Sequence, residues 1–168
     1  MINFNIIKKL KRNDIKLLIL DIDGCLSNGQ IHYLQEGQNM VFSIYDGEAI
    51  KEMIKKIDVI VISGRKCMGT YKRCIELGIV DEKIFLAVGN KKAVLEKYLL
   101  DKPDIKKENI IAIGDQQSDL CLLDSINIFV CPRNTPDFDV IQHADYITFT
   151  NGGVSAIFEL YKLIEAFL

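Results

Sequence analysis

The sequence predicts an α/β fold in which a doubly wound parallel sheet (Rossmann-like) carries helices on both faces. Short apolar runs of strand length alternate with segments whose apolar residues recur at helical spacing. Most of these runs end in a glycine or a polar residue, as expected for parallel strands that are buried on both faces. With 168 residues and 49% apolar composition, the chain suits one domain over residues 1–168 with a sizeable core.

The expected elements follow one another along the chain. A lead-in helix is expected within residues 1–16, where apolar and basic residues are mixed. The expected strands cover residues 17–20, 59–62, 84–88, 110–113, 126–130 and 146–149. The expected helices cover residues 46–56, 70–77, 91–100, 119–124, 140–144 and 154–167. Right-handed crossovers bring the carboxyl ends of parallel strands to one edge of the sheet, where such folds bind ligands.

Residues 27–45 interrupt this alternation. Apolar and polar residues alternate on both sides of Gln35-Glu36-Gly37-Gln38, which predicts a projecting β-hairpin. A two-stranded hairpin is marginally stable in water, so its apolar residues need cover. Two sources of cover stay open at this point: a neighbouring subunit, or the hairpin's own domain.

The first strand leads into two carboxylates. Asp21-Ile22-Asp23-Gly24 follows the apolar run that ends at Leu20. The glycine lets the chain bend, so that both carboxylates can face one site. Two buried carboxylates are unfavourable unless a cation meets them, and a divalent cation bound through oxygen is the simplest partner. The alternative is a polar loop without chemistry.

Three further segments place polar groups at the same edge. Ser63 and Gly64 follow the second strand and offer a hydroxyl and backbone N–H groups to an anion. Lys92 lies in the helix after the third strand and adds positive charge. The candidate ligands for Mg²⁺ are Asp21, Asp23, Asp115 and Asp119. Each group alone could be a helix cap or a surface charge. Together they predict a phosphoryl site with a carboxylate nucleophile.

Composition excludes other classes of partner. The net charge is −2 and neither sign forms a long block, so no nucleic-acid surface is expected. No apolar run approaches the length of a membrane span, and no membrane partner is expected. Five cysteines without a Cys-x-x-Cys pair suggest neither a zinc site nor a disulfide framework, and favour a cytoplasmic protein.

These motifs resemble the haloacid dehalogenase superfamily of aspartate-nucleophile phosphatases, over nearly the whole chain. The four matching motifs are Asp21-Ile22-Asp23-Gly24, Ile62-Ser63-Gly64-Arg65, Lys92, and Gly114-Asp115 through Asp119. The resemblance implies that Asp21 attacks phosphorus and that Asp23 acts as general acid and then as base. It also implies that Ser63, Gly64 and Lys92 bind the phosphoryl group.

The same resemblance implies a magnesium site. Its ligands would be Asp21, the main-chain carbonyl of Asp23, and Asp115, with Asp119 as a supporting or alternative ligand.

A narrower resemblance is to the capless 3-deoxy-D-manno-octulosonate 8-phosphate phosphatases and the related nonulosonate 9-phosphate phosphatases. It rests on residues 21–29, Tyr45-Asp46-Gly47, Gly64-Arg65-Lys66, residues 144–148 and Gly152-Gly153. It implies a homotetramer in which the hairpin and neighbouring subunits close each other's sites. The candidates for contacting an acidic sugar are Glu48, Arg65, Lys66 and Arg73.

The chain also departs from the octulosonate pattern. Tyr45, Val154 and Phe158 stand where arginines are usual, and Gln116 stands where a second aspartate is usual. An arginine fork suits a carboxylate better than these side chains do, so both acidic sugar phosphates stay open as substrates.

Two other classes of protein remain as alternatives. One is a non-catalytic oligomerisation or binding module of the same fold, against which the intact motifs argue. The other is a signalling receiver domain, which needs adjacent acids after its first strand, whereas Asp21 and Asp23 are separated by one residue.

Overall fold

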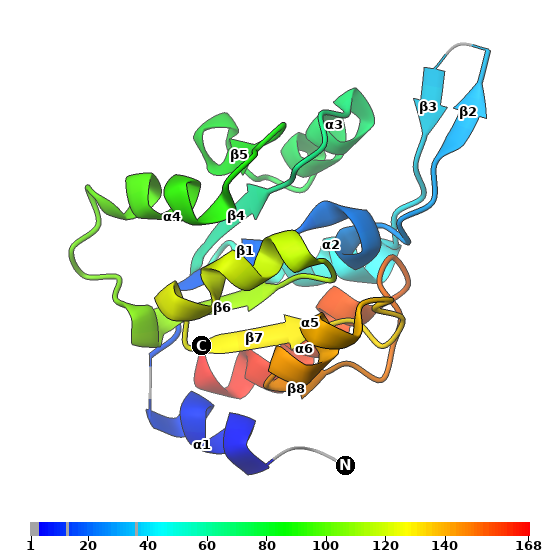
Figure 1. Cartoon of the computed structure of the whole chain (residues 1–168). Helices are drawn as coiled ribbons and strands as arrows, with labels where there is room; N and C mark the ends of the chain where they lie inside the picture. Colours follow the sequence, from blue (N-terminus) through cyan, green and yellow to red (C-terminus); the bar gives the residue numbers. More distant parts are fainter. Residues whose placement is uncertain (1–3, 13, 36) are drawn as a thin grey trace.

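A six-stranded parallel sheet forms the centre of the computed structural model, which describes residues 4–12, 14–35 and 37–168 (Figure 1). The strand order is β5-β4-β1-β6-β7-β8, which places β1 in the interior of the sheet. The strands are β1 (Leu17–Leu20), β4 (Asp58–Ile62), β5 (Ile84–Phe85), β6 (Ile110–Ile113), β7 (Ile128–Cys131) and β8 (Tyr146–Ile147). The predicted parallel sheet is confirmed.

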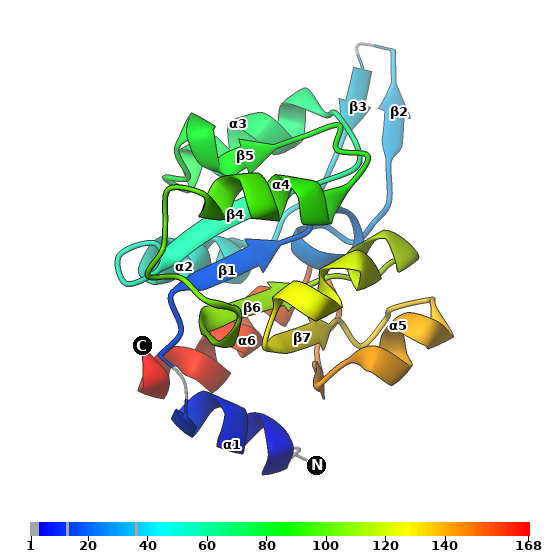
Figure 2. The ribbon, with the colours of Figure 1, turned by 60° about the vertical axis from the view of Figure 1, so that its left-hand side comes forward.

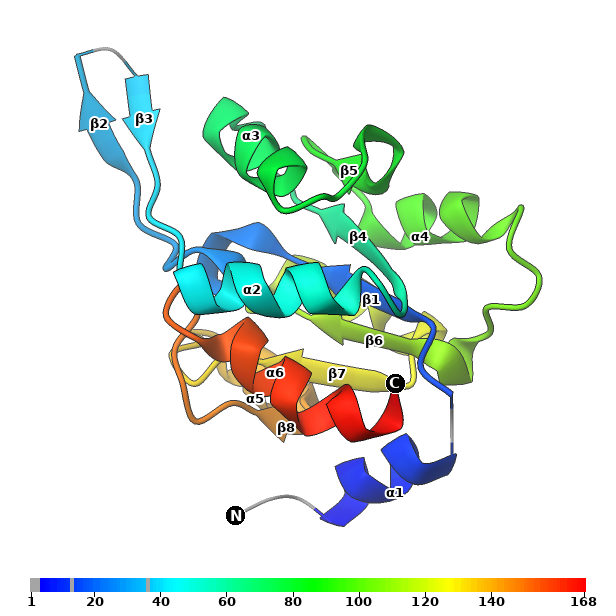
Figure 3. The ribbon, with the colours of Figure 1, turned by 180° about the vertical axis from the view of Figure 1, so that it is seen from behind.

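Helices cover both faces of the sheet (Figures 2 and 3). They are α1 (Phe4–Arg12), α2 (Ile44–Met53), α3 (Met68–Glu76), α4 (Lys91–Leu99), α5 (Phe138–His143) and α6 (Ala156–Ile164). Short 3₁₀ segments span Asp81–Lys83, Lys107–Asn109, Gln117–Ser125 and Glu165–Phe167. None of the described helices is long and apolar enough to cross a membrane.

The strands are apolar throughout because each one feeds two cores. Along β1, Leu18 and Leu20 pack into the cluster that contains α1, α2 and α6, whereas Leu17 and Ile19 pack into the cluster that contains α4 and α5. Side chains alternate between the two faces of a strand, and both faces are covered here. This burial fixes the position of β1, and therefore of the turn that follows it.

The predicted hairpin is present and projects beyond the carboxyl end of β1 (Figures 1 and 2). Its strands are β2 (His32–Leu34) and β3 (Gly37–Asn39), and Glu36 of the predicted turn lies outside the described residues. The alternation of Met40, Phe42 and Ile44 in the sequence predicts that the second arm continues to residue 44. Instead, Met40 and Phe42 pack against the core, and Ile44 begins α2.

Other boundaries also differ from those expected. The third strand ends at Phe85, after which Ala87 adopts a positive φ of 57° and the chain leaves the sheet. The segment expected to be helical before residue 124 is the 3₁₀ helix Gln117–Ser125.

Candidate active site

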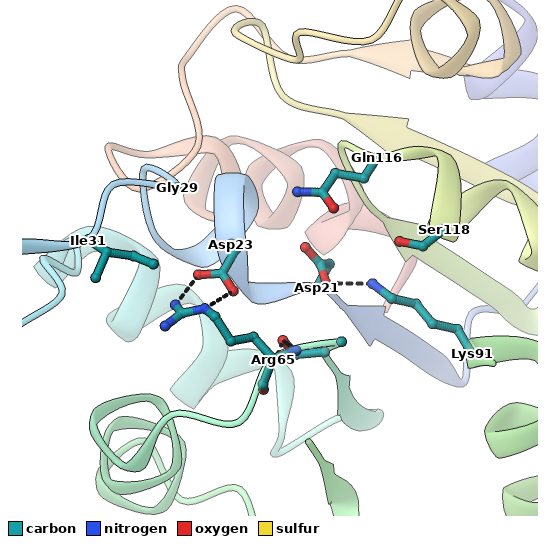
Figure 4. Close-up of a pocket in the computed structure, with 10 residues that line it drawn as sticks. Asp21, Asp23, Gly29, Ile31, Arg65, Lys91, Gln116 and Ser118 are labelled. Atoms are coloured by element: carbon teal, nitrogen blue, oxygen red, sulfur yellow. Dashed lines mark hydrogen bonds and ion pairs between the residues drawn. The ribbon is translucent and has the colours of Figure 1, made fainter. Parts of the chain in front are cut away.

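A pocket lies at the carboxyl ends of β1, β4 and β6 (Figure 4). It is lined by Asp21, Asp23, Gly29, Ile31, Ser63, Gly64, Arg65, Lys91, Gln116 and Ser118. The structure therefore brings both aspartates of the first motif together with the serine and glycine of the second. These residues come from segments far apart in the sequence, as the predicted parallel topology requires.

The turn after β1 presents Asp21 and Asp23 to the same pocket. Residues Ile22–Leu26 form a tight π-type turn, within which Gly24 has a φ of +89°. A Cβ atom at Gly24 would lie 1.9 Å from Asp115 Oδ2, so a side chain there would displace that carboxylate. Glycine is therefore needed for both its conformation and its size.

The loop that carries Gly152 and Gly153 packs against the backbone of this turn. A Cβ atom at Gly152 would lie 1.7 Å from the carbonyl oxygen of Gly24, and the amide of Gly153 donates to the carbonyl of Cys25 over 2.8 Å. The glycine pair allows this loop to pack directly on the backbone that bears Asp23.

A buried lysine joins two of the carboxylates. Lys91 Nζ lies 2.5 Å from Asp21 Oδ1 and 2.6 Å from Asp119 Oδ1. Burial by itself would lower the pKa of Lys91, but the carboxylates of Asp21 and Asp119 raise it above its usual value. Lys91 is therefore the cation that joins the carboxylates of Asp21 and Asp119.

The expectation for Lys92 needs correction, because the structure directs this side chain away from the pocket. Lys92 is partly exposed and lies 3.8 Å from Asp124. Asn90 caps α4 by accepting a hydrogen bond from the amide of Ala93, so Lys91 begins the helix. Successive residues of an α-helix point about 100° apart, and only Lys91 faces the carboxylates.

The carboxylate of Asp119 is occupied by protein groups. Its Oδ2 accepts hydrogen bonds from the amides of Asp115 (3.1 Å) and Gln116 (3.0 Å), while its Oδ1 contacts Lys91. Gly114 leaves room for it, because a Cβ atom there would lie 2.3 Å from Asp119 Cγ. In this arrangement Asp119 orients Lys91 and the Asp115 loop, and it does not present a free oxygen to a metal ion.

Asp115 does present a free oxygen. Its Oδ1 is buried and has no hydrogen-bond partner among the described residues. Burial, followed by the nearby charges of Asp21 and Asp119, raises the pKa of Asp115 to about 7. Burial also raises the pKa of Asp21 to about 7; Lys91 opposes this rise and Asp119 adds to it.

Asp21 and Asp115 fit a hard divalent cation. Ligand atoms of Asp21, Cys25 and Asp115 lie within 4.8 Å of one another. Burial raises the pKa of the Cys25 thiol well above its usual value, so this sulfur stays protonated and unsuited to a hard cation. The two carboxylates are oxygen donors whose mutual repulsion a cation would relieve.

Ser63 and Gly64 form the opposite wall of the pocket. The backbone of Ser63 is fixed to β5 through its amide, which donates to the carbonyl of Phe85 over 2.9 Å. The hydroxyl of Ser63 accepts a hydrogen bond from the amide of Arg65 (3.2 Å). This wall offers the hydroxyl of Ser63 and an accessible backbone, because Gly64 has no side chain to cover it.

Of the four candidates for contacting a sugar, Arg65 is the one that lines this pocket. Its Nε donates to Asp23 Oδ2 over 2.8 Å, and its Nη2 contacts Asp23 Oδ1. The sequence does not predict this ion pair, because Asp23 and Arg65 belong to different motifs. No pattern in the sequence links them.

The structure places the other three candidates away from the pocket. Glu48 borders a separate groove beside α6, and Lys66 borders an apolar hollow next to Cys67. Arg73 donates to the carbonyl of Ser43 over 3.4 Å and lies 3.6 Å from Glu76. Lys91, Ile31 and Ser118 are pocket residues that the sequence did not single out. Asn90 at the start of α4 is a cap signal that could have identified Lys91.

Comparisons with known proteins agree with this site. Residues 84–159 match the family model of haloacid dehalogenase-like hydrolases. The chain is 33% identical to the 3-deoxy-D-manno-octulosonate 8-phosphate phosphatase of Salmonella typhi over 156 residues, which cover 92% of this chain and 81% of that protein. It is 30% identical to the corresponding enzyme of Haemophilus influenzae, with coverage of 92% and 84%.

A solved structure is similar over almost the whole chain. The 3-deoxy-D-manno-octulosonate 8-phosphate phosphatase of Moraxella catarrhalis, solved in complex with a magnesium ion, a phosphate ion and KDO, superposes with a TM-score of 0.87. It is 29% identical, and the match covers 97% of this chain and 91% of that one. The sequence identity, the coverage and the shared fold together show that this chain is a phosphatase of the haloacid dehalogenase superfamily and belongs to the family of the 3-deoxy-D-manno-octulosonate 8-phosphate phosphatases.

Proposed function

We propose that this phosphatase hydrolyses the phosphate monoester of an acidic sugar, with Mg²⁺ as its cofactor and a phosphoryl intermediate on Asp21. The observation that carries the proposal is the excess of buried carboxylates beside Ser63 and Gly64, which we call the phosphate-binding wall. Lys91 pairs with two of the three buried carboxylates, Asp21 and Asp119, and Asp115 Oδ1 is left without a partner among the described residues. Such an arrangement is costly without a cation and is typical of functional sites.

In the first step, a carboxylate oxygen of Asp21 attacks phosphorus, and the bond between phosphorus and the sugar oxygen breaks. Asp23 donates its proton to that leaving oxygen. In the second step, a water molecule attacks the phosphoryl group on Asp21 while Asp23 takes a proton from the water, which releases phosphate and restores both aspartates. Lys91, Ser63 and the backbone at Gly64 would bind the phosphoryl oxygens, because they line the same pocket as Asp21.

The carboxylates of Asp21 and Asp115 would hold Mg²⁺, and the family pattern adds the main-chain carbonyl of Asp23. When bound, the ion neutralises charge on the phosphoryl oxygens and on the two carboxylates. Asp119 supports this site by fixing Lys91 and the amide of Asp115.

For the substrate, we propose an octulosonate 8-phosphate or a nonulosonate 9-phosphate. The relatives named above act on 3-deoxy-D-manno-octulosonate 8-phosphate. In this chain Tyr45 and Phe158 lie with their ring centroids 6.1 Å apart, and Val154 is exposed, so apolar surface replaces the family's usual arginines. A nonulosonate with apolar substituents therefore remains as good a candidate as the octulosonate.

We also propose that residues 27–45 take the place of a cap domain and that the protein is a homotetramer. The hairpin and its base expose large apolar side chains, namely Tyr33 (75%), Leu34 (56%), Val41 (58%), Ile44 (73%) and Tyr45 (61%). An exposed patch of this kind favours cover by further copies of the chain. Analytical ultracentrifugation at assay concentration tests this; a monomeric mass would contradict it.

The deciding experiment measures phosphate release from a panel of sugar phosphates, with Mg²⁺ or with EDTA. The panel contains octulosonate 8-phosphate, nonulosonate 9-phosphates and neutral hexose phosphates. We expect Mg²⁺-dependent release that favours one acidic sugar and is lost in Asp21→Asn. The matched control is Asp124→Asn, an exposed aspartate outside the pocket. Wild-type activity in Asp21→Asn would contradict the mechanism, and equal rates on neutral sugars would contradict the acidic substrate.

A further inference from the structure

One guanidinium group connects the first motif, the phosphate-binding wall and the hairpin. The Nε and Nη2 atoms of Arg65 form a bidentate ion pair with Asp23 (Figure 4). Its Nη1 donates to Gln38 Oε1 on β3 over 3.3 Å, and its Nη2 lies 3.0 Å from the sulfur of Met40. Residues 38–40, which we call the hairpin stem, therefore contact Arg65 on one side, and the carboxylate of Asp23 contacts it on the other. Asp23 is the residue that we assign as general acid and base.

The backbone end of this link is fixed. The amide of Arg65 donates to the hydroxyl of Ser63, which is itself buried at the end of β4. The planar guanidinium allows little variation in a bidentate pair, so the position of Arg65 sets the orientation of the Asp23 carboxylate. Within the described part of the chain, Arg65 is the only side chain that forms a hydrogen bond or ion pair with this carboxylate.

The hairpin end of the link is also anchored. The sulfur of Met40 lies 3.3 Å from the hydroxyl of Thr70 and 3.6 Å from Cys67 Sγ. Thr70 and Cys67 are buried beside the loop that carries Arg65. A displacement of the hairpin stem would therefore move Met40 against Arg65, and Arg65 against Asp23.

We propose that Arg65 is a positioning residue that holds the Asp23 carboxylate for proton transfer, and that the hairpin stem acts on catalysis through Met40 and Arg65. This inference rests on the proposed function, because it assigns Asp23 the role of acid and base. It gives the hairpin a role inside its own subunit, separate from any role as a cover for other subunits.

The test uses p-nitrophenyl phosphate, whose leaving group departs as a stable anion and needs no proton. In Arg65→Ala, formation of the phosphoryl intermediate should continue, while its hydrolysis slows because Asp23 is misplaced. We expect a rapid burst of about one p-nitrophenol per active site, followed by a steady rate lower by roughly 10²-fold; KM should fall with kcat, so that kcat/KM changes little. Added guanidinium should restore part of the steady rate, and Arg65→Lys should fall between wild type and Arg65→Ala.

The hairpin is tested by Met40→Ala and Gln38→Ala, with Asn39→Ala as the matched control on the same strand. Met40→Ala should lower the steady rate of p-nitrophenol release several-fold. Gln38→Ala should lower this rate by a smaller factor, and Asn39→Ala should leave it unchanged. If Met40 acts through Arg65, the double variant Met40→Ala/Arg65→Ala should be no slower than Arg65→Ala alone.

Two results would overturn the inference. One is an Arg65→Ala enzyme with the wild-type rate on p-nitrophenyl phosphate and a raised KM for acidic sugars only, which would make Arg65 a substrate contact. The other is full additivity of the Met40 and Arg65 effects, which would remove the hairpin from the link. A wild-type protein that released no phosphate from any ester would contradict the proposed function itself, and this inference with it. Thermal melts of each variant separate these results from misfolding.

Discussion

The sheet carries an aspartate–lysine cluster at each end, and the two clusters have opposite charge balance. The site cluster, at the carboxyl ends of the strands, consists of Asp21, Asp115, Asp119 and Lys91. The scaffold cluster, at the start of β4, consists of Asp58, Lys83, Tyr98 and Lys102. The first sets three carboxylates against one lysine, and the second sets one carboxylate against two lysines.

This difference reverses the direction of the pKa shifts. In the site cluster, burial raises the pKa of Asp21 to about 7 in spite of Lys91. In the scaffold cluster, burial alone would raise the pKa of Asp58, but hydrogen bonds from Lys83 and Tyr98, together with the charge of Lys102, lower it. The same residue types therefore form a stabilising ion-pair cluster at the start of β4. At the carboxyl ends of the strands they form a site with excess negative charge, which a bound cation would stabilise.

Replacing Lys91 should have the largest effect, because it removes the one cation that the described residues supply to the site cluster. In Lys91→Met, Asp21 and Asp119 lose their shared partner. We expect turnover to fall by at least about 10²-fold and the free energy of unfolding to fall by about 3–5 kcal/mol. Urea denaturation and phosphate release measure these effects. The matched variant Lys92→Met should change stability by less than about 0.5 kcal/mol; equal losses in the two variants would contradict the placement of Lys91.

Replacing Asp115 should stabilise the metal-free protein while removing its response to Mg²⁺. Asp115→Asn relieves repulsion with Asp21 and Asp119, so in EDTA at pH 8 we expect a gain of about 1–2 kcal/mol, or roughly 3–6 °C in Tm. Mg²⁺ should raise the Tm of the wild type and not that of the variant. Differential scanning fluorimetry measures both shifts, and a preserved Mg²⁺ shift in the variant would exclude Asp115 as a ligand.

Asp46 is a buried carboxylate outside the site, and it forms no ion pair with the described residues. Burial raises its pKa to about 6, although amides of α6 oppose the rise; the amide of Phe158 donates to its Oδ1 over 2.9 Å. A raised carboxyl pKa contributes stability that is present at low pH and is lost as pH rises through the folded-state pKa.

We therefore expect Asp46→Asn to gain stability relative to wild type by about 2 kcal/mol between pH 4 and pH 7.5. Unfolding curves at several pH values measure the difference. A difference that does not change with pH would show that Asp46 is neutral or solvated throughout this range.

Replacing Asp58 should have the smallest effect. Its carboxylate lies at the protein surface, with its side chain 25% exposed, so Asp58→Asn should cost about 1 kcal/mol at neutral pH and leave activity unchanged. Because the pKa of Asp58 is lowered, its contribution is present above the unfolded-state pKa and is lost as pH falls through the folded-state value. The stabilities of wild type and variant should therefore converge in acid, and a loss of activity at neutral pH would contradict a purely structural role.

The sequence by itself determined the parallel sheet, the order of the motifs and the edge at which they meet. Unbroken apolar runs such as Leu17 to Leu20 can be satisfied only by burial on both faces, and that condition is local to each strand. Once the strands are parallel, Asp21, Ser63 and Asp115 reach one edge of the sheet whatever the details of packing.

The tertiary structure decided which neighbouring side chain enters the site and which groups contact one another there. Lys91 and Lys92 are chemically identical, and a rotation of about 100° between successive helix residues, with the helix start set by the cap at Asn90, separates a buried cation from a surface one. The pairing of Arg65 with Asp23 was likewise decided there, because it directly joins residues 42 positions apart, next to the packed side chain of Met40. Such contacts depend on three-dimensional proximity, which composition and local spacing do not encode.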